Sequence, residues 1–202
     1  MIKNIILDIG DVLVKSDYHE FFLKKGCDES TVERLEKATF FSPEWKELDR
    51  GAVLLPDIID GFVRNDPGIE PWLRRVFNDM SGFVTAYPYA EEWVESLRQS
   101  GLKVFCLSNI SDIICRDCAD DMKFLDMVDG FILSYQEKLI KPDPEIFRLL
   151  MKKYGLTAEE CVFIDDLEPN VNAAKRLGMH GIIFRNKTQA QEEIDKIRRT
   201  ET

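Results

Sequence analysis

The chain has 202 residues, a length that suits one α/β domain or a core domain with a small inserted one. Apolar residues make up 45% of it and charged residues 32%, so we expect a soluble protein with a substantial core. Its net charge is −10 and it has no Lys/Arg-rich run, which argues against nucleic acid as a partner, because that binding needs a basic face. An acidic protein that handles an anionic substrate needs a cation to offset repulsion, which favours a metal.

The cysteines indicate the compartment. There are five, an odd number, and no secretory signal is recognisable, so we expect a reducing, cytoplasmic location. Cys115 and Cys118 form a lone C-x-x-C in a predicted helix, where packing is favoured over a zinc or redox role. No segment reaches the ~20 apolar residues that cross a bilayer, so no membrane partner is expected.

The first predicted strand covers residues 3–9 and runs into Asp8-Ile9-Gly10-Asp11. An acid, a glycine and a second acid are an unusual end for a strand that only builds a core. They are typical of a buried strand that delivers a carboxylate to the carboxyl edge of a sheet, where ligands bind in open α/β folds. Asp8 is therefore a candidate nucleophile or metal ligand.

A mostly helical, polar stretch without a clear strand follows over about 17–85. Strands and helices then alternate, the pattern of a parallel sheet. The predicted strands are 103–107, 130–133, 161–164 and 181–184, and the predicted helices are 89–100, 111–124, 144–154, 169–177 and 188–199. This pattern predicts an α/β fold: a doubly wound, parallel, five-stranded sheet with an inserted small helical cap. We expect residues 1–15 and 86–202 to form the core and residues 16–85 to form the cap.

Polar side chains follow these strands at their carboxyl ends or lie in the loops between them. In chain order they are Asp8, Ser108, Asn109, Lys141, Asp165, Asp166 and Asn170. Acids clustered with oxygen-only partners suit Mg²⁺, which takes one or two carboxylates and keeps waters. A hydroxyl, an amide and an ammonium suit the oxygens of a phosphoryl group. With a metal screening the charge, a carboxylate can attack phosphorus and form an acyl phosphate.

Each residue also has a structural alternative. Asp8 could cap a turn, Ser108-Asn109 could cap a helix, and Lys141 could be a solvated loop lysine. The adjacent acids Asp165-Asp166 could belong to a turn. The joint pattern, rather than any single residue, favours a phosphoryl site.

Four segments resemble the motifs of the haloacid dehalogenase superfamily, in that family's order: IILDIGDVL, FCLSN, LIKPDPEIF and VFIDDLEPNVNAAKRLGM. The resemblance covers residues 2–15 and 86–185, and extends to about 16–85 only in length and helical character. It implies a Rossmann-like catalytic core with an inserted cap. It also implies a hydrolase, most often a Mg²⁺-dependent phosphatase (a phosphoric monoester hydrolase) that works through an aspartyl-phosphate intermediate.

By position, the resemblance implies roles around the metal. Asp8 would be the nucleophile and a Mg²⁺ ligand, and Gly10 would lend its backbone carbonyl. Asp166 would bind the metal, and Asp165 would either support it or coordinate directly. Asn170 would orient this metal site.

The resemblance implies a second set of roles around the phosphoryl group. Ser108 and the Asn109 backbone would bind its oxygens. Lys141 would neutralise the nucleophile and the transferring group, an electrostatic contribution whose loss typically costs orders of magnitude in rate.

Gly10 departs from the family pattern, which usually has a second aspartate there as general acid and base. Such help is worth roughly 10²–10⁴ in rate. Three interpretations stay open. The leaving group could need no acid, Asp11 could substitute in part, or the protein could hydrolyse poorly and act by binding.

The motifs are most similar to the α-glucose-1-phosphate phosphatase-like branch, which has Asp-x-Gly-Asn where this chain has Asp11 after the glycine. We therefore expect a small phosphorylated substrate of the sugar-phosphate type and Mg²⁺ as cofactor. One alternative is a catalytically weak phosphate-binding or regulatory member. A more remote one is a metal-free 2-haloacid dehalogenase, against which the pair Asp165-Asp166 argues.

The insert offers a few candidate substrate contacts. Trp45, Arg50 and Arg64 are considered, with Trp45 favoured as cap core. His19 lies near the predicted hinge into the cap, and His180 is expected at a surface or turn. The expected assembly is a monomer or a weak homodimer.

Overall fold

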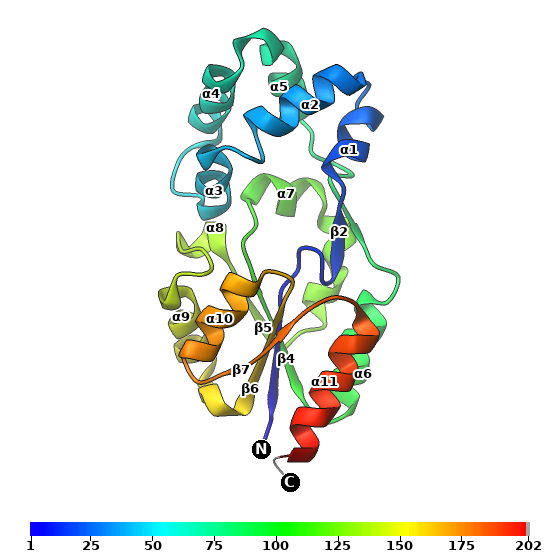
Figure 1. The fold of residues 1–202 in the computed structure, drawn as a ribbon, viewed down its shortest axis with the longest axis vertical. Coiled ribbons are helices and arrows are strands. Elements are labelled where there is room, and N and C mark those ends of the chain that lie inside the picture. The colour runs from blue at the N-terminus through cyan, green and yellow to red at the C-terminus, as the bar shows by residue number, and fades with distance from the viewer. Residues whose placement is uncertain (201–202) are drawn as a thin grey trace.

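The computed structural model describes residues 1–200. Five parallel strands form one sheet in the order β5-β4-β1-β6-β7 (Figure 1). They are β1 (Asn4–Leu7), β4 (Lys103–Ser108), β5 (Gly130–Leu133), β6 (Cys161–Asp165) and β7 (His180–Ile183). The predicted α/β fold with a five-stranded parallel sheet and a helical insertion is confirmed.

The central strand β1 is buried on both faces, as expected for an apolar strand of a covered parallel sheet. Leu7 at its end pairs with Cys106 of β4 and with Ile164 of β6. The amide of Asp8 donates to the Ile164 carbonyl at 2.9 Å, which extends the ladder by one residue. The register therefore brings Asp8, Ser108 and Asp165 to the same edge of the sheet.

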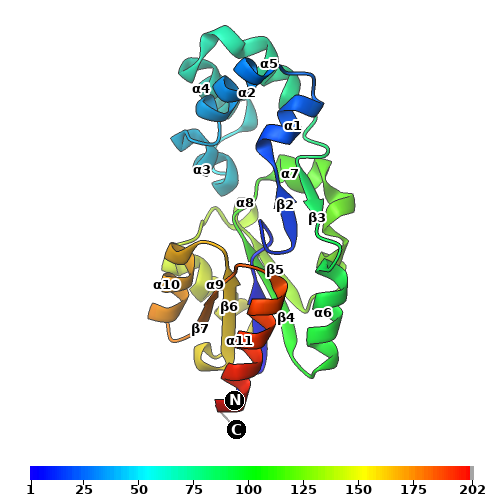
Figure 2. The ribbon, with the colours of Figure 1, turned by 45° about the vertical axis from the view of Figure 1, so that its right-hand side comes forward.

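Side chains alternate between the two faces of the sheet, as the two-residue period of a strand requires. Ile5, Leu7, Val104 and Cys106 pack with the helices α6 and α11, whereas Ile6 packs with α9 and α10. Figures 1 and 2 show these two helix layers on opposite faces of the sheet. The layers consist of α6 (Ala90–Gln99), α11 (Lys187–Thr200), α9 (Pro144–Tyr154) and α10 (Glu168–Arg176).

A two-stranded antiparallel ribbon of β2 (Val14–Ser16) and β3 (Val84–Ala86) connects the helical insertion to the core. No strand was predicted at either end of the insertion, and this prediction was wrong. Strands of three residues are too short to show an alternation of apolar and polar side chains. Between the two strands lie α1 (Tyr18–Lys24), α2 (Glu29–Ala38), α3 (Pro43–Arg50), α4 (Leu55–Asn65), the 3₁₀ helix η1 (Pro67–Ile69) and α5 (Glu70–Val76). Figure 1 shows these helices beyond the carboxyl edge of the sheet.

An aromatic cluster holds the insertion together. The ring of Phe40 lies 4.0 Å from that of Tyr18 and 4.3 Å from that of Trp45. Phe83, just before β3, stacks on both Tyr18 and Phe40. Such pairs contribute ~0.5–1.5 kcal/mol each beyond the area they bury. Trp45 therefore belongs to the core of the insertion, as predicted.

The segment between β4 and β5 differs from its prediction. A single helix was expected over 111–124, but α7 covers only Asp112–Asp117, and a 3₁₀ stretch, η2 (Ala119–Asp126), follows after Cys118. A short helix, α8 (Ser134–Glu137), and the 3₁₀ helix η3 (Ala158–Glu160) were not predicted, because each is about one turn long. Within residues 1–200, no helix combines the length and the apolar character that a bilayer crossing requires.

Candidate active site

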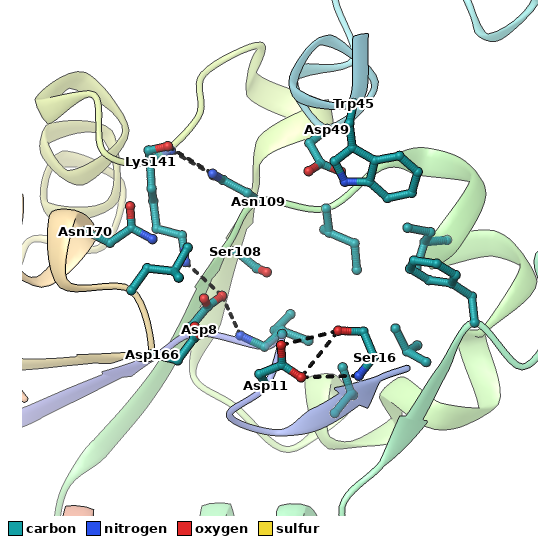
Figure 3. Close-up of a pocket in the computed structure, with 18 of the residues that line it drawn as sticks. Asp8, Asp11, Ser16, Trp45, Asp49, Ser108, Asn109, Lys141, Asp166 and Asn170 are labelled. Atoms are coloured by element: carbon teal, nitrogen blue, oxygen red, sulfur yellow. Dashed lines mark hydrogen bonds and ion pairs between the residues drawn. The ribbon is translucent and has the colours of Figure 1, made fainter. Parts of the chain in front are cut away.

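The carboxyl edge of the sheet and the helical insertion enclose a cavity of about 270 Å³ (Figure 3). The predicted residues that line this cavity are Asp8, Gly10, Ser108, Asn109, Lys141, Asp166 and Asn170. Most of them lie at or just after the ends of β1, β4 and β6. Lys141 lies in the loop before α9, and Asn170 lies in the first turn of α10. Asp165 is fully buried behind them and does not line the cavity.

Lys141 joins two of the predicted acids. Its ammonium lies 2.8 Å from Oδ1 of Asp8 and 2.7 Å from Oδ2 of Asp165. All three side chains are buried, so these contacts are screened little by water. Burial alone would lower the pKa of Lys141, but the two carboxylates raise it above its usual range. Lys141 is thus held in its charged form.

The adjacent acids Asp165 and Asp166 have different environments. Besides Lys141, Asp165 accepts hydrogen bonds from the Leu167 amide at 2.8 Å and from Nδ2 of Asn170 at 3.0 Å. Burial alone would raise the pKa of Asp165, but Lys141 and the Leu167 amide outweigh it and hold this pKa below its usual range. Asp166 instead faces the cavity. Asp166 thus lines the cavity, whereas the Asp165 carboxylate lies behind it in contact with Lys141.

The carboxylates carry more negative charge than Lys141 can balance. Burial raises the pKa of Asp8 to about 8, although Lys141 opposes this effect. Burial, with the charges of Asp165 and Asp11, raises the pKa of Asp166 to about 6. Carboxylate oxygens of Asp8, Asp165 and Asp166 lie within 4.8 Å of one another. Such a cluster would be stabilised by a second cation.

The donor set fits magnesium. Mg²⁺ prefers oxygen ligands, takes one or two carboxylates and retains waters. Asp8 and Asp166 supply two carboxylates beside a cavity that can hold the waters, and Gly10 lines the same cavity. No cysteine or histidine belongs to this cluster, which argues against zinc.

Asn109 has a structural function in its side chain. Its Nδ2 donates to the Lys141 carbonyl at 3.0 Å, and its Oδ1 accepts from the Lys141 amide at 2.7 Å (Figure 3). This pair fixes the loop that carries Lys141 against the end of β4. The Ser108 side chain is buried and points into the cavity.

Gly10 and Asp11 form the turn after β1. A Cβ placed on Gly10 would meet no atom within 4 Å, so the position at which the sequence resemblance leads one to expect an acid is open space. Asp11 has a positive φ of 52°, which Asp tolerates better than most residues. Its carboxylate accepts from the Ser16 amide and hydroxyl, each at 3.3 Å. Asp11 therefore binds the last residue of β2 while it lines the cavity.

The helical insertion forms the roof of the cavity. Trp45 and Asp49, one helical turn apart on α3, both line it (Figure 3). Burial raises the pKa of Asp49 to about 7, and Lys141 opposes this shift. Asp49 was not among the residues expected at the site from the sequence. The signal that could have found it is its i, i+4 spacing from Trp45, which places both on one helix face.

The other predicted contacts lie away from the cavity. Nε of Arg50 donates a hydrogen bond to Glu47 on its own helix. On the surface, Nε2 of His19 lies 2.8 Å from a carboxylate oxygen of Glu29. Arg64 and His180 also do not line the cavity.

The chain is similar in sequence to known hydrolases and phosphatases. Residues 2–178 match the family model described as haloacid dehalogenase-like hydrolase. The D-ribitol-5-phosphate phosphatase of Bacteroides thetaiotaomicron is 28% identical over 207 residues, which cover 98% of each protein. The sesquiterpene phosphatase astK of Aspergillus oryzae is 26% identical over 89% of this chain and 88% of its own length.

Some relatives are longer than this chain. The drimenol cyclase drtB of Aspergillus calidoustus is 24% identical over 98% of this chain, but the match spans 37% of that protein. The match to the phosphatase MT3486 of Mycobacterium tuberculosis is partial on both sides: it spans 57% of this chain and 54% of that protein, at 28% identity.

Solved structures share the fold. A hydrolase of Porphyromonas gingivalis superposes with a TM-score of 0.73 at 23% identity, over 98% of both chains. The enzyme bt-2542 of Bacteroides thetaiotaomicron, in complex with magnesium and inorganic phosphate, gives a TM-score of 0.70 at 24% identity, over 92% of this chain and 95% of its own.

Proposed function

The chain belongs to the haloacid dehalogenase-like hydrolases, and from this membership we propose that it is a Mg²⁺-dependent phosphatase of small phosphate monoesters. The observation that carries the proposal is the position of Lys141 between Asp8 and Asp165, with Asp166 facing the same cavity. This arrangement presents a nucleophilic carboxylate, a fixed cation and an open metal ligand to one small space.

Asp8 is the nucleophile in this proposal. Its carboxylate attacks phosphorus, and the phosphoryl group is transferred to it as an aspartyl phosphate, which water then hydrolyses. Lys141 holds the carboxylate in place and balances the charge that develops on the phosphoryl oxygens. Asp165 keeps Lys141 charged and oriented.

The metal would be held by Asp8, Asp166 and the Gly10 carbonyl, with Asn170 acting on this site through its bonds to Asp165. When bound, Mg²⁺ supplies positive charge that screens the anionic substrate from these carboxylates. The Ser108 hydroxyl and the backbone N–H of Asn109 would bind the phosphoryl oxygens, since both residues lie at the end of β4 on the cavity wall.

We propose a substrate of the sugar-phosphate or polyol-phosphate type, within the α-glucose-1-phosphate phosphatase-like branch. A cavity of about 270 Å³ lies at the small end of ligand sites, which suits a small metabolite. The full-length similarity to a D-ribitol-5-phosphate phosphatase also supports this class. The roof residues 16–85 would act as a cap that closes over the substrate and excludes water.

We further propose a cytoplasmic protein that acts as a monomer or weak homodimer without a nucleic-acid partner. Five cysteines without a disulfide and a net charge of −10 support the location and the absence of nucleic acid.

The alternative of a catalytically weak, phosphate-binding protein is favoured by one observation, the open space at Gly10. Phosphate release from a panel of phosphorylated metabolites, with Mg²⁺ and with chelator, distinguishes the two. We expect Mg²⁺-dependent turnover. Tight phosphate binding without turnover of any member of the panel would favour the alternative, and halide release from a 2-haloacid in chelator would favour a dehalogenase.

A further inference from the structure

The cavity lacks an acid at position 10 but contains other titratable side chains. Asp8 and Asp166 face the metal position, and Lys141 is held between two carboxylates. Asp11 accepts hydrogen bonds from Ser16 with both carboxylate oxygens. One carboxyl remains, that of Asp49, and it comes from the roof.

Asp49 faces the cavity without a hydrogen-bond donor. Among the described residues, its carboxyl is influenced only by burial and by the charge of Lys141. Figure 3 shows Asp49 projecting from α3 across the cavity from Asp8 and Ser108. A phosphoryl group bound at Ser108 and attacked by Asp8 directs its leaving oxygen away from Asp8, towards this roof.

The core fixes the end of α3 that carries Asp49. The Asp49 carbonyl accepts from Oγ of Ser134 at 2.6 Å, and Nζ of Lys138 donates to the Gly51 carbonyl. A Cβ on Gly51 would lie 2.8 Å from the Tyr135 carbonyl, so α3 and α8 approach closely here. These contacts position Asp49 relative to the strand ends rather than only to its own helix.

We propose that Asp49 is the general acid and base of the reaction, in place of the aspartate that Gly10 lacks. This inference rests on the proposed phosphatase function. In the first step the Asp8 carboxylate forms a bond to phosphorus as the bond to the leaving oxygen breaks. The electron pair goes to that oxygen, which takes the proton of the Asp49 carboxyl and departs as an alcohol.

The second step restores both residues. A water molecule attacks phosphorus and gives one proton to the Asp49 carboxylate. The bond between phosphorus and Asp8 breaks, and its electron pair returns to the Asp8 carboxylate. Inorganic phosphate leaves, and Asp49 is protonated for the next cycle.

The protonation of Asp49 suits this task. Burial raises its pKa to about 7, so near neutral pH the carboxyl and carboxylate forms are both populated. General acids work best with a pKa near the operating pH. The charged and titratable groups that face Asp49 are Lys141 from the loop before α9, Tyr18 from α1 and Cys115 from α7. Of these, only Lys141 carries a charge near neutral pH.

The test compares leaving groups in Asp49→Asn and in the unmodified protein, with saturating Mg²⁺. The substrates are p-nitrophenyl phosphate, whose phenolate leaves without a proton, phenyl phosphate, and D-ribitol 5-phosphate, whose alkoxide needs one. We expect Asp49→Asn to lower kcat/KM by about 10²–10⁴-fold for the alkyl ester and by less than about tenfold for p-nitrophenyl phosphate. The decline of the alkyl-ester rate above about pH 7 should also disappear.

Two further variants sharpen this test. Asp57→Asn removes an exposed carboxyl from the neighbouring helix α4 and should change none of these rates. Gly10→Asp, in the Asp49→Asn background, places a carboxyl in the open space two residues after Asp8 and should restore the alkyl-ester rate. If Asp49→Asn does not fold, shown by circular dichroism, the smaller neutral variant Asp49→Ser takes its place.

The outcomes separate this inference from the function on which it rests. Selective loss with the alkyl ester, and its rescue at position 10, support Asp49 as the acid. An equal loss for all three esters, or no loss, overturns that role while phosphatase activity stands. If the unmodified protein releases no phosphate from any of them with Mg²⁺, both the proposed function and the role of Asp49 are overturned.

Discussion

The ammonium of Lys141 lies 2.8 Å from the carboxylate of Asp8, and both side chains are buried at the carboxyl edge of the sheet. Asp165 contacts the same ammonium at 2.7 Å, so two carboxylates hold Lys141 beside Asp8. The contact holds the proposed nucleophile in one position and leaves its other oxygen to a metal.

Replacing Lys141 by Met should damage both activity and stability. Two buried carboxylates would lose their cation, and breaking a buried pair in this way costs about 3–5 kcal/mol. The loss of a charge that stabilises the transition state should lower kcat by roughly 10²–10³-fold. Urea unfolding and phosphate release measure the two effects. Lys123→Met, which removes an exposed lysine paired with Asp120, is the matched control and should change neither.

Asp166→Asn should weaken Mg²⁺ binding without harming the fold. Loss of a direct ligand should cost more than the roughly 10–100-fold that is typical of an outer partner. Asp165→Asn should instead destabilise the protein, because its carboxylate is buried against Lys141 and Asn170. Isothermal titration with Mg²⁺ and thermal unfolding in chelator distinguish the variants, and the opposite pattern would make Asp165 the direct ligand.

Without metal, the stability difference between Asp166→Asn and the unmodified protein should depend on pH. Folding raises the pKa of Asp166 from 3.8 to about 6, so the native state disfavours its charged form. This unfavourable contribution is absent below pH 3.8, grows as pH rises through 6 and is complete above it. In chelator, Asp166→Asn should therefore have a higher Tm than the unmodified protein at pH 7. The difference should shrink towards pH 4, and a lower Tm at pH 7 would contradict this account.

Magnesium affinity should fall as the pH is lowered. Without metal the pKa of Asp8 is raised to about 8 and that of Asp166 to about 6, and a cation binds only their ionised forms. Protons therefore compete with Mg²⁺ for Asp8 as the pH falls below about 8, and the loss of affinity steepens below about pH 6, where Asp166 is protonated as well. Calorimetric titration at several pH values, in buffers of different ionisation enthalpy, should also show proton release. A pH-independent affinity would count against these ligands.

Asp11→Ala should lower the stability of the turn between β1 and β2 more than it lowers the rate of phosphate release. It loses bonds to Ser16 and places Ala at a φ of 52°, which together should cost about 1–3 kcal/mol. Asp11→Asn keeps an acceptor and tolerates this φ, so its loss of stability should be smaller. Neither should change the ratio of rates for alkyl and aryl phosphates. A selective loss with the alkyl ester in Asp11→Asn would instead identify Asp11 as the acid.

The sheet and its polar strand ends could be predicted because their signals are local. Apolar runs, turn residues and the rule that ligands bind at carboxyl edges locate Asp8, Ser108 and Asp166 without a structure. The short ribbon of β2 and β3 could not be found in this way, since three residues carry no period. Its pairing joins residues about 70 positions apart, from Val14 to Ala86.

Two features of the site depend on tertiary structure alone. Adjacent in sequence, Asp165 and Asp166 differ because Asp165 ends β6 and contacts Lys141, whereas Asp166 lies just beyond the strand and lines the cavity. Asp49 gains its place from contacts between α3 and α8, which no motif encodes. Arg50, one residue on, was considered instead and points elsewhere, which shows how one helical step decides the outcome.

The most direct test of the central claim is phosphate release by Asp8→Asn beside the unmodified protein, with D-ribitol 5-phosphate and p-nitrophenyl phosphate in Mg²⁺. We predict Mg²⁺-dependent release by the unmodified protein, no release above background by Asp8→Asn, and an unchanged circular dichroism spectrum for the variant. Release by Asp8→Asn at an undiminished rate would contradict the account, because the reaction would then proceed without the Asp8 carboxylate.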